Sequence, residues 1–142
     1  MNAPAAPAHR SAVRRLAAPL TALAAAAAPA LFVAAVDPNT PGRYPVCPFL
    51  QATGWWCPGC GGLRCVHALT HGHPLQALHD NLLVVLLLTT AALLWLNWAA
   101  SALASRPVRL PTLHLRHVLP AIAVVAAFTV ARNLPLGAAL AP

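Results

Sequence analysis

The residues of this chain best suited to chemistry are its cysteines, three of which lie close together. Cys47 precedes the motif Cys57-Pro58-Gly59-Cys60-Gly61 by a short stretch that contains two tryptophans. Cysteines with such spacing hold a metal ion, form a disulfide or exchange electrons. All three interpretations use the same sulfur atoms, so the elements that position these atoms matter for each.

The cysteine pair in this motif has the spacing of a metal knuckle. Two residues between Cys57 and Cys60 allow both thiolates to turn toward one ion. Pro58 fixes its own φ, and Gly59 and Gly61 allow backbone N–H groups to approach the sulfurs. The pair therefore predicts half of a possible zinc site.

A structural zinc site needs four ligands, so two more must come from elsewhere. Cys47 is the third candidate. Two histidines one helical turn apart, His67 and His71, would share a helix face near the cysteines. The weaker candidates for the fourth ligand are Cys65, His67 and His71.

Two other interpretations compete with zinc. Outside the cytoplasm, neighbouring thiols form disulfides, and Cys47 could pair with Cys57 or Cys60. A Cys-x-x-Cys motif at a helix start also lowers the pKa of a thiol and permits disulfide exchange. No βαβ pattern supports a thioredoxin-like domain. A structural staple, made by a disulfide or by zinc, is therefore favoured over thiol redox chemistry.

The composition indicates a membrane protein. The 142 residues are 59% hydrophobic and 8% charged, against roughly 25% charged residues in soluble domains. Lys and Glu are absent and the only acids are Asp37 and Asp80, which excludes a Schiff base, a P-loop lysine and a glycosidase carboxylate pair. The net charge of +7 comes from arginines that flank apolar runs, so we expect no nucleic-acid partner.

Three apolar runs are expected to cross the bilayer. The uncharged run 82–104 would extend about 34 Å as a helix, enough to span the hydrocarbon core, and its Asn97 is expected to face another helix. The run 16–36 favours a retained anchor over a cleaved signal peptide because it exceeds the usual apolar length of a signal. The third run, 117–136, is interrupted by Arg132.

Three charged residues are predicted to lie near the cysteines. Arg64 follows Cys60 by one helical turn and would stabilise a thiolate or bind an anionic group. Arg132 is expected to snorkel from the end of the third span, with burial in the bundle as the functional alternative, and in either case to approach the cysteine loop. Asp80, at the start of the second span, is expected to pair with Arg64 or Arg132.

The distribution of arginines predicts the orientation of the chain in the membrane, because cytoplasmic segments carry more of them than segments outside. One side of the membrane would carry six, namely Arg10, Arg14, Arg15, Arg106, Arg109 and Arg116, and the other side would carry three, namely Arg43, Arg64 and Arg132. We expect a multi-pass protein of the cell inner membrane with a cytoplasmic N-terminus. Its fold class is all-α integral membrane protein, with three transmembrane helices plus short interfacial or re-entrant helices. The expected segments are a basic cytoplasmic tail (1–15), a first span (16–36), an extracytoplasmic cysteine-rich loop (37–81), a second span (82–104), a basic cytoplasmic loop (105–116), a third span (117–136) and a C-terminal tail (137–142).

Several of these features occur together in one known family. They are the Cys47-Pro48-Phe49 step, the CPGCG motif followed by Arg64, Asn81 before an apolar span, and the run Arg132-Asn133-Leu134-Pro135. With them the chain, over roughly residues 40–136, resembles a family of small bacterial membrane proteins catalogued as domain of unknown function 2752. The resemblance implies a multi-span inner-membrane protein and assigns no activity. The family pattern marks Cys47, Cys57, Pro58, Gly59, Cys60, Gly61, Arg64 and Arg132; Cys65 lies outside it.

The sequence therefore favours a non-enzymatic protein. Its CPGCG site would act as a structural staple for a binding or assembly role at the membrane surface. The expected partners are the lipid bilayer and another membrane protein, and the possible cofactor is zinc. The alternative is a membrane thiol-redox accessory protein that exchanges disulfides.

Overall fold

The computed structural model describes residues 12–107 and 114–142, so Arg10 and Arg109 of the predicted cytoplasmic segments lie outside it. Every regular element within the described residues is helical, as the sequence predicts. The elements are α1 (Ala12–Ala35), α2 (Pro48–Thr53), α3 (Gly62–Thr70), α4 (Pro74–Leu103), α5 (Leu115–Ala131) and the 3₁₀ helix η1 (Pro135–Leu140).

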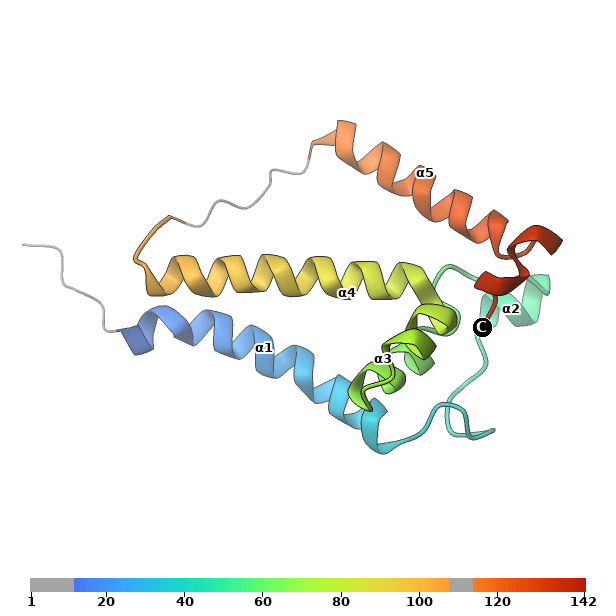
Figure 1. Cartoon of the computed structure of the whole chain (residues 1–142), viewed down its shortest axis with the longest axis horizontal. Coiled ribbons are helices and arrows are strands. Elements are labelled where there is room, and N and C mark those ends of the chain that lie inside the picture. Colours follow the sequence, from blue (N-terminus) through green and yellow to red (C-terminus); the bar gives the residue numbers. More distant parts are fainter. Residues whose placement is uncertain (1–11, 108–113) are drawn as a thin grey trace, which may run out of the picture.

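The two long helices α1 and α4 run antiparallel beside each other (Figure 1). At one end of the pair, a guanidinium nitrogen of Arg15 donates to the hydroxyl of Ser105. Further along, the indole Nε1 of Trp95 donates to the carbonyl of Pro19 at 2.9 Å. The cysteine loop lies at the opposite end, where α1 ends and α4 begins.

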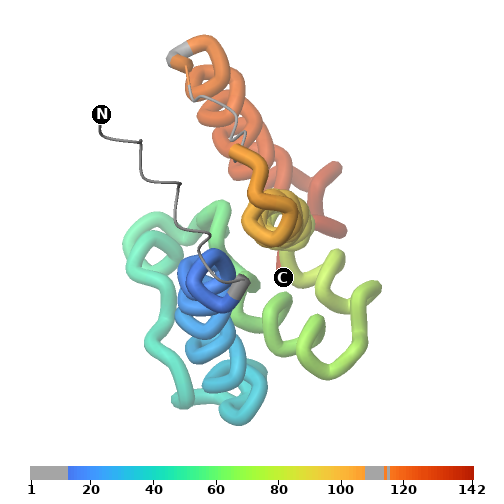
Figure 2. Tube along the Cα trace, turned by 90° about the vertical axis from the view of Figure 1, so that its left-hand side faces the viewer, coloured from blue at the N-terminus to red at the C-terminus, as the bar shows by residue number. Residues whose placement is uncertain are grey.

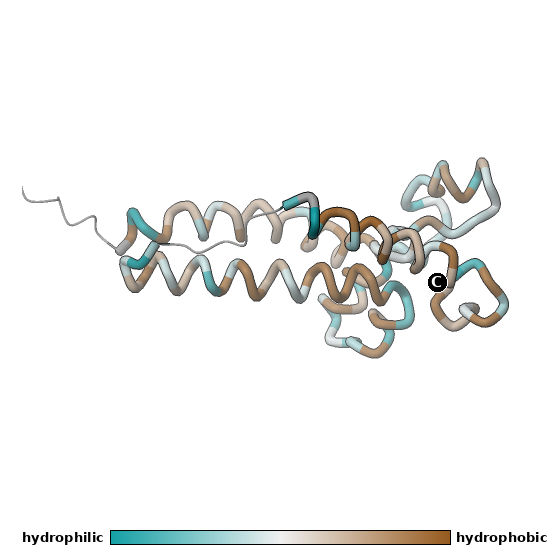
Figure 3. Tube along the Cα trace, turned by 90° about the horizontal axis from the view of Figure 1, so that it is seen from above, coloured by the Kyte–Doolittle hydropathy of each residue, from teal (hydrophilic) through white to brown (hydrophobic). Residues whose placement is uncertain are grey.

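Both long helices have the length and apolar composition needed to cross a membrane. Their large apolar side chains face outward: Leu31 is 67% exposed and Leu87 is 66% exposed. Figure 3 shows apolar colouring along both long helices, with hydrophilic positions at the end where α1 begins and α4 ends, and a loop of mixed hydropathy at the other end. Such exposure suits helices surrounded by lipid and is costly for helices in water.

The third predicted span corresponds to a shorter helix. α5 has 17 residues, which extend about 26 Å, and its apolar face is likewise exposed, as at Ile122 (59%). The helix ends at Ala131, with Arg132 as its C-cap, and the following chain turns into η1 instead of continuing as a helix to residue 136. α5 joins the rest of the described structure at this end and is set apart from α1 when viewed along the helices (Figure 2).

A kink in α4 separates its membrane-like part from its first turns. Asn81 has φ −165° and ψ 97°, which interrupts the helix immediately before the apolar run that starts at Leu82. The turns before the kink pack against α3, where Cys65, Ala68 and Ala77 form a small buried core. Gly72, with φ +76°, and Pro74 produce the sharp turn between the two helices.

Candidate metal centre

The sulfur atoms of Cys47, Cys57 and Cys60 form one cluster. The Sγ of Cys57 lies 3.5 Å from that of Cys47 and 2.8 Å from that of Cys60, and all three lie within 4.8 Å of one another. A zinc ion bonded to sulfur at about 2.3 Å in a tetrahedron keeps its sulfurs about 3.8 Å apart. Shifts of an ångström or less would therefore adapt the cluster to one metal ion.

Short-range features of the sequence bring these sulfurs together. Cys47 caps α2, whose first residue is Pro48, while Cys57 and Cys60 stand at the two ends of a turn closed by the Cys60 N–H and the Cys57 carbonyl at 3.1 Å. The Cys57 N–H in return donates to the Cys60 sulfur at 3.2 Å. Gly61 then takes φ +83° and starts α3.

Arg132, at the end of α5, holds this turn through hydrogen bonds to its backbone. Its two terminal nitrogens donate to the carbonyls of Cys57 at 2.9 Å and Cys60 at 3.1 Å. The side chain is only 1% exposed, its Nε has no hydrogen-bond partner among the described residues, and its guanidinium lies 5.0 Å from the ring centre of Phe128. Arg132 thus reaches the cysteine loop as predicted, but the expected snorkelling is wrong because the loop supplies acceptors that cover it.

Asn81, at the kink of α4, holds the same turn from a second direction. Its Nδ2 donates to the carbonyls of Pro58 and Cys60, both at 2.9 Å, and its Oδ1 accepts the N–H of Val84 at 3.0 Å. The residue is fully buried. The amide therefore links the cysteine turn to the start of the second long helix and replaces helix hydrogen bonds that the kink removes.

Asn133 completes the support around Trp56. Its Oδ1 accepts the Trp56 N–H at 2.8 Å, and its Nδ2 donates to the Trp56 carbonyl at 2.9 Å and to the Thr129 carbonyl at 2.7 Å. The carbonyl of Gly59 is closed locally by the Gly62 N–H at 2.9 Å. Every carbonyl from Trp56 to Cys60 thus has a donor, and the turn is a preorganised platform for its sulfurs.

The surroundings of the cysteine thiols shift their pKa values in different directions. The pKa of Cys47 lies below its ordinary value, mainly because the backbone N–H of Leu50 faces its sulfur. Burial, assisted by the neighbouring Cys57, raises the pKa of Cys60 to about 12. Without a metal, Cys60 is therefore a neutral thiol at physiological pH, whereas Cys47 loses its proton more readily.

Gly61 is the position where a side chain would most directly disturb the cluster. A Cβ there would collide with the carbonyl oxygen of Asp80 and lie 2.7 Å from the Cβ of Pro142, in addition to the left-handed φ. We expect Gly61→Ala to lower the free energy of unfolding by about 3 kcal/mol, measured by thermal unfolding in detergent.

Gly72→Ala is the matched control for this prediction, because Gly72 also has a left-handed φ of +76° but has nothing within 4 Å of an added Cβ. It should lower the free energy of unfolding by only about 1 kcal/mol, which is the cost of the left-handed φ without a steric clash. Equal losses for the two variants would contradict the close approach at Gly61.

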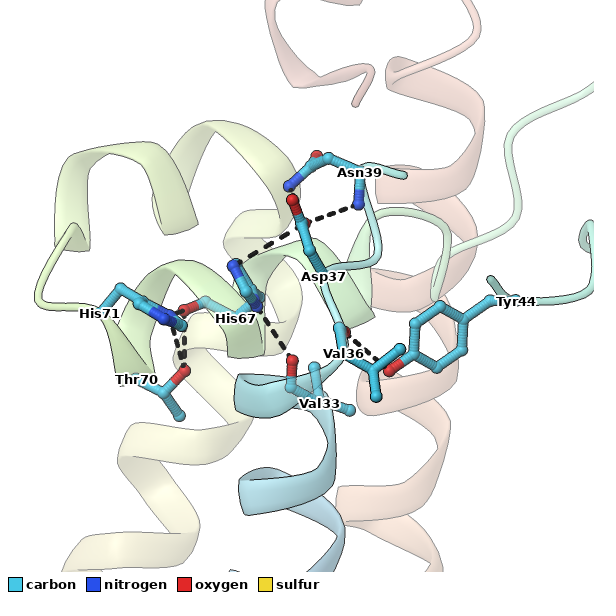
Figure 4. A network of polar contacts seen from close by, with 8 residues as sticks. All are labelled: Val33, Val36, Asp37, Asn39, Tyr44, His67, Thr70 and His71. Carbon is cyan, nitrogen blue, oxygen red and sulfur yellow. Dashed lines mark hydrogen bonds and ion pairs between the residues drawn. The ribbon is translucent and has the colours of Figure 1, made fainter. Parts of the chain in front are cut away.

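The weaker ligand candidates lie outside the sulfur cluster. Cys65 is completely buried in the small core beside Ala68, where burial raises its pKa to about 11. His67 directs its Nδ1 to the carbonyl of Val33 at 2.9 Å and its Nε2 to Asp37 at 3.7 Å, and His71 stacks beside it with ring centres 4.2 Å apart (Figure 4). His67 thereby ties α3 to the end of α1, while His71 contacts His67 and Thr70 of its own helix.

The two remaining charged residues have different surroundings. Asp80 is buried and accepts a hydrogen bond from the Nε2 of Gln76 at 3.1 Å; the expected ion pair with Arg64 or Arg132 does not occur among the described residues. Arg64 lies in the first turn of α3 and, with Cys47 and Cys60, lines an open cavity of about 500 Å³.

The sequence interpretation did not assign Asn81 and Asn133 to the site. The sequence nevertheless contains a signal for both residues. An amide directly beside an apolar run needs a hydrogen-bond partner when the run is packed. Both also occur in the set of residues that carries the family resemblance.

Residues 47–95 match the family model described as "Protein of unknown function (DUF2752)". The match confirms the predicted resemblance and includes the three clustered cysteines and Asn81, while Arg132 and Asn133 lie beyond it. We found no match to the chain among curated proteins or among solved structures.

Proposed function

We propose that this chain, which carries the domain of unknown function 2752 over residues 47–95, is a three-span inner-membrane protein with a metal–thiolate staple at its outer surface. Cys47, Cys57 and Cys60 bind one zinc ion, which ties the loop after α1 to the turn held by α4 and α5. The stapled surface serves binding or assembly with another membrane protein. Exposed apolar side chains beside it, such as Phe49 (44%) and Trp55 (47%), suit the headgroup layer or such a partner.

The buried charge of Arg132 is the observation that carries the metal proposal. Among the described residues neither acid neutralises it, because Asp37 lies beside His67 and Asp80 accepts from Gln76. Carbonyl dipoles and the Phe128 ring stabilise the guanidinium only in part, and a buried cation needs a nearby anion. A disulfide is neutral, whereas three thiolates around Zn²⁺ carry one net negative charge next to Arg132.

Metal analysis of the purified protein tests this proposal. We expect about one zinc per chain in the wild type, and loss of most of it in Cys47→Ser, Cys57→Ser and Cys60→Ser, since each removes one of only three sulfur ligands. Cys65→Ala is the matched control, because this cysteine lies in the core of α3 and α4 and should leave the zinc content unchanged. Wild-type protein without zinc, with its cysteines oxidised, would refute the metal centre.

The membrane orientation has its own test. An epitope inserted at Gly42, an exposed turn of the loop, should be reached by antibody on intact spheroplasts, because the loop is proposed to face outward. An epitope at the N-terminus should be reached only after the membrane is permeabilised. The reverse pattern would invert the orientation, and recovery of the protein in the supernatant without detergent would remove the membrane placement.

Thiol exchange is the second candidate function, favoured by the 2.8 Å between the Cys57 and Cys60 sulfurs and by the lowered pKa of Cys47. An exchange protein forms a mixed disulfide with its partner before the second cysteine resolves it. Cys60→Ser should then trap a partner on Cys57 that reductant releases. A trapped partner, together with a wild type that lacks zinc, would favour this function over the staple.

A further inference from the structure

The metal centre described above is incomplete with protein ligands alone. In the described part of the chain, Cys47, Cys57 and Cys60 are the only group of three or more His, Cys, Asp or Glu side chains close enough to share an ion. Zinc prefers four ligands, and sites with three protein ligands keep the fourth position for an exchangeable group. The fourth ligand of this centre must therefore come from outside these residues.

The cavity beside the cysteines offers a place for such a ligand. Two of the three sulfur-bearing residues, Cys47 and Cys60, belong to its wall. Its volume of about 500 Å³ falls in the range of small-molecule sites and is far larger than one water molecule needs. Tyr44 and Trp56 line it with aromatic surface, so an organic molecule fits better than a bare ion.

The charge of the cavity selects an anionic ligand. Its described lining contains the cation Arg64 and no acidic side chain. Arg132, which is not among the residues that line the cavity, already offsets the single negative charge of a zinc tris-thiolate. A second anion at the metal is therefore best placed where Arg64 can pair with it.

We propose, on the basis of the metal centre proposed above, that this cavity binds a small thiol that carries a carboxylate. Its sulfur loses a proton to solvent and becomes the fourth ligand of the metal, and its carboxylate pairs with Arg64. A fourth sulfur matches the preference of a thiolate-rich site for soft ligands. The staple is thereby also a receptor for a low-molecular-weight thiol.

Cobalt-substituted protein in detergent tests this inference, because the absorption of Co²⁺–thiolate centres reports the number of sulfur ligands. Titration with 3-mercaptopropionate should convert a three-sulfur spectrum into a four-sulfur spectrum. Propionate, which lacks the sulfur, should leave the three-sulfur spectrum. 2-Mercaptoethanol, which lacks the carboxylate, should bind about tenfold more weakly than 3-mercaptopropionate.

The Arg64→Met variant isolates the role of the cation. It should retain one cobalt per chain but lose the tenfold preference for the carboxylate thiol, whereas Arg43→Met, a loop arginine outside the cavity lining, should keep it. Failure to take up cobalt would overturn the metal centre itself. One bound cobalt with a spectrum unchanged by 3-mercaptopropionate, a response to propionate, or equal affinity for the two thiols would overturn only the thiol-carboxylate ligand.

Discussion

Arg132→Met should lower the metal affinity of this protein by about 100-fold, and the free energy of unfolding of the metal-loaded protein by about 3–5 kcal/mol. The substitution removes two charged donors, from the carbonyls of Cys57 at 2.9 Å and Cys60 at 3.1 Å. It also removes the buried charge that we propose offsets the metal–thiolate cluster. Metal competition with a chelator and thermal unfolding in detergent measure the two effects.

The metal-free protein distinguishes a charge effect from a packing effect. Without the thiolate charge, Met at position 132 relieves an uncompensated cation, so the loss of stability should be smaller than in the loaded protein. Arg132→Lys should give an intermediate affinity, because one ammonium cannot reproduce the planar fork that reaches both carbonyls. Arg106→Met, at an exposed position near the other end of α4, is the matched control and should change neither quantity. Wild-type metal affinity in Arg132→Met would contradict the proposed charge compensation.

Asn81→Leu should lower the free energy of unfolding by about 3 kcal/mol. Leu has the same branching and the same number of side-chain heavy atoms, but it leaves the Pro58 carbonyl and the Val84 N–H without the Asn81 partner. It also takes one of two side-chain donors from the Cys60 carbonyl. Because the position is fully buried, water cannot replace these bonds. Thermal unfolding in one detergent compares the variant with the wild type.

Asn97→Leu is the control on the same helix. The sequence predicts that Asn97 faces another helix, but its side chain is exposed in this chain. Replacing an exposed amide on a helix that is proposed to face lipid should change stability by no more than about 0.5 kcal/mol, or increase it. A loss at position 97 as large as at position 81 would show that the hydrogen bonds of Asn81 do not determine its contribution.

Local patterns were sufficient to predict the two long helices. The apolar runs predicted α1 and α4, because hydrophobic length is a property of consecutive residues. The third run was less informative, because its helix ends just before Arg132. A cation at a helix end extends to water or turns inward depending on whether the tertiary structure supplies hydrogen-bond acceptors for it.

From the sequence alone we predicted the helical fold found in the described residues, the long apolar helices that flank a cysteine-rich loop, and Cys47, Cys57 and Cys60 as the sulfurs to examine. Spacing and hydropathy are properties of neighbouring residues, so they can be recognised from the sequence alone. Tertiary structure alone decided that Cys65, His67 and His71 lie apart from the cluster. It also decided that Arg132, Asn81 and Asn133 hold the backbone of the cysteine turn. These contacts join residues 21 to 77 positions apart, which come together because α3 packs against α4 and η1 packs against both α4 and α5.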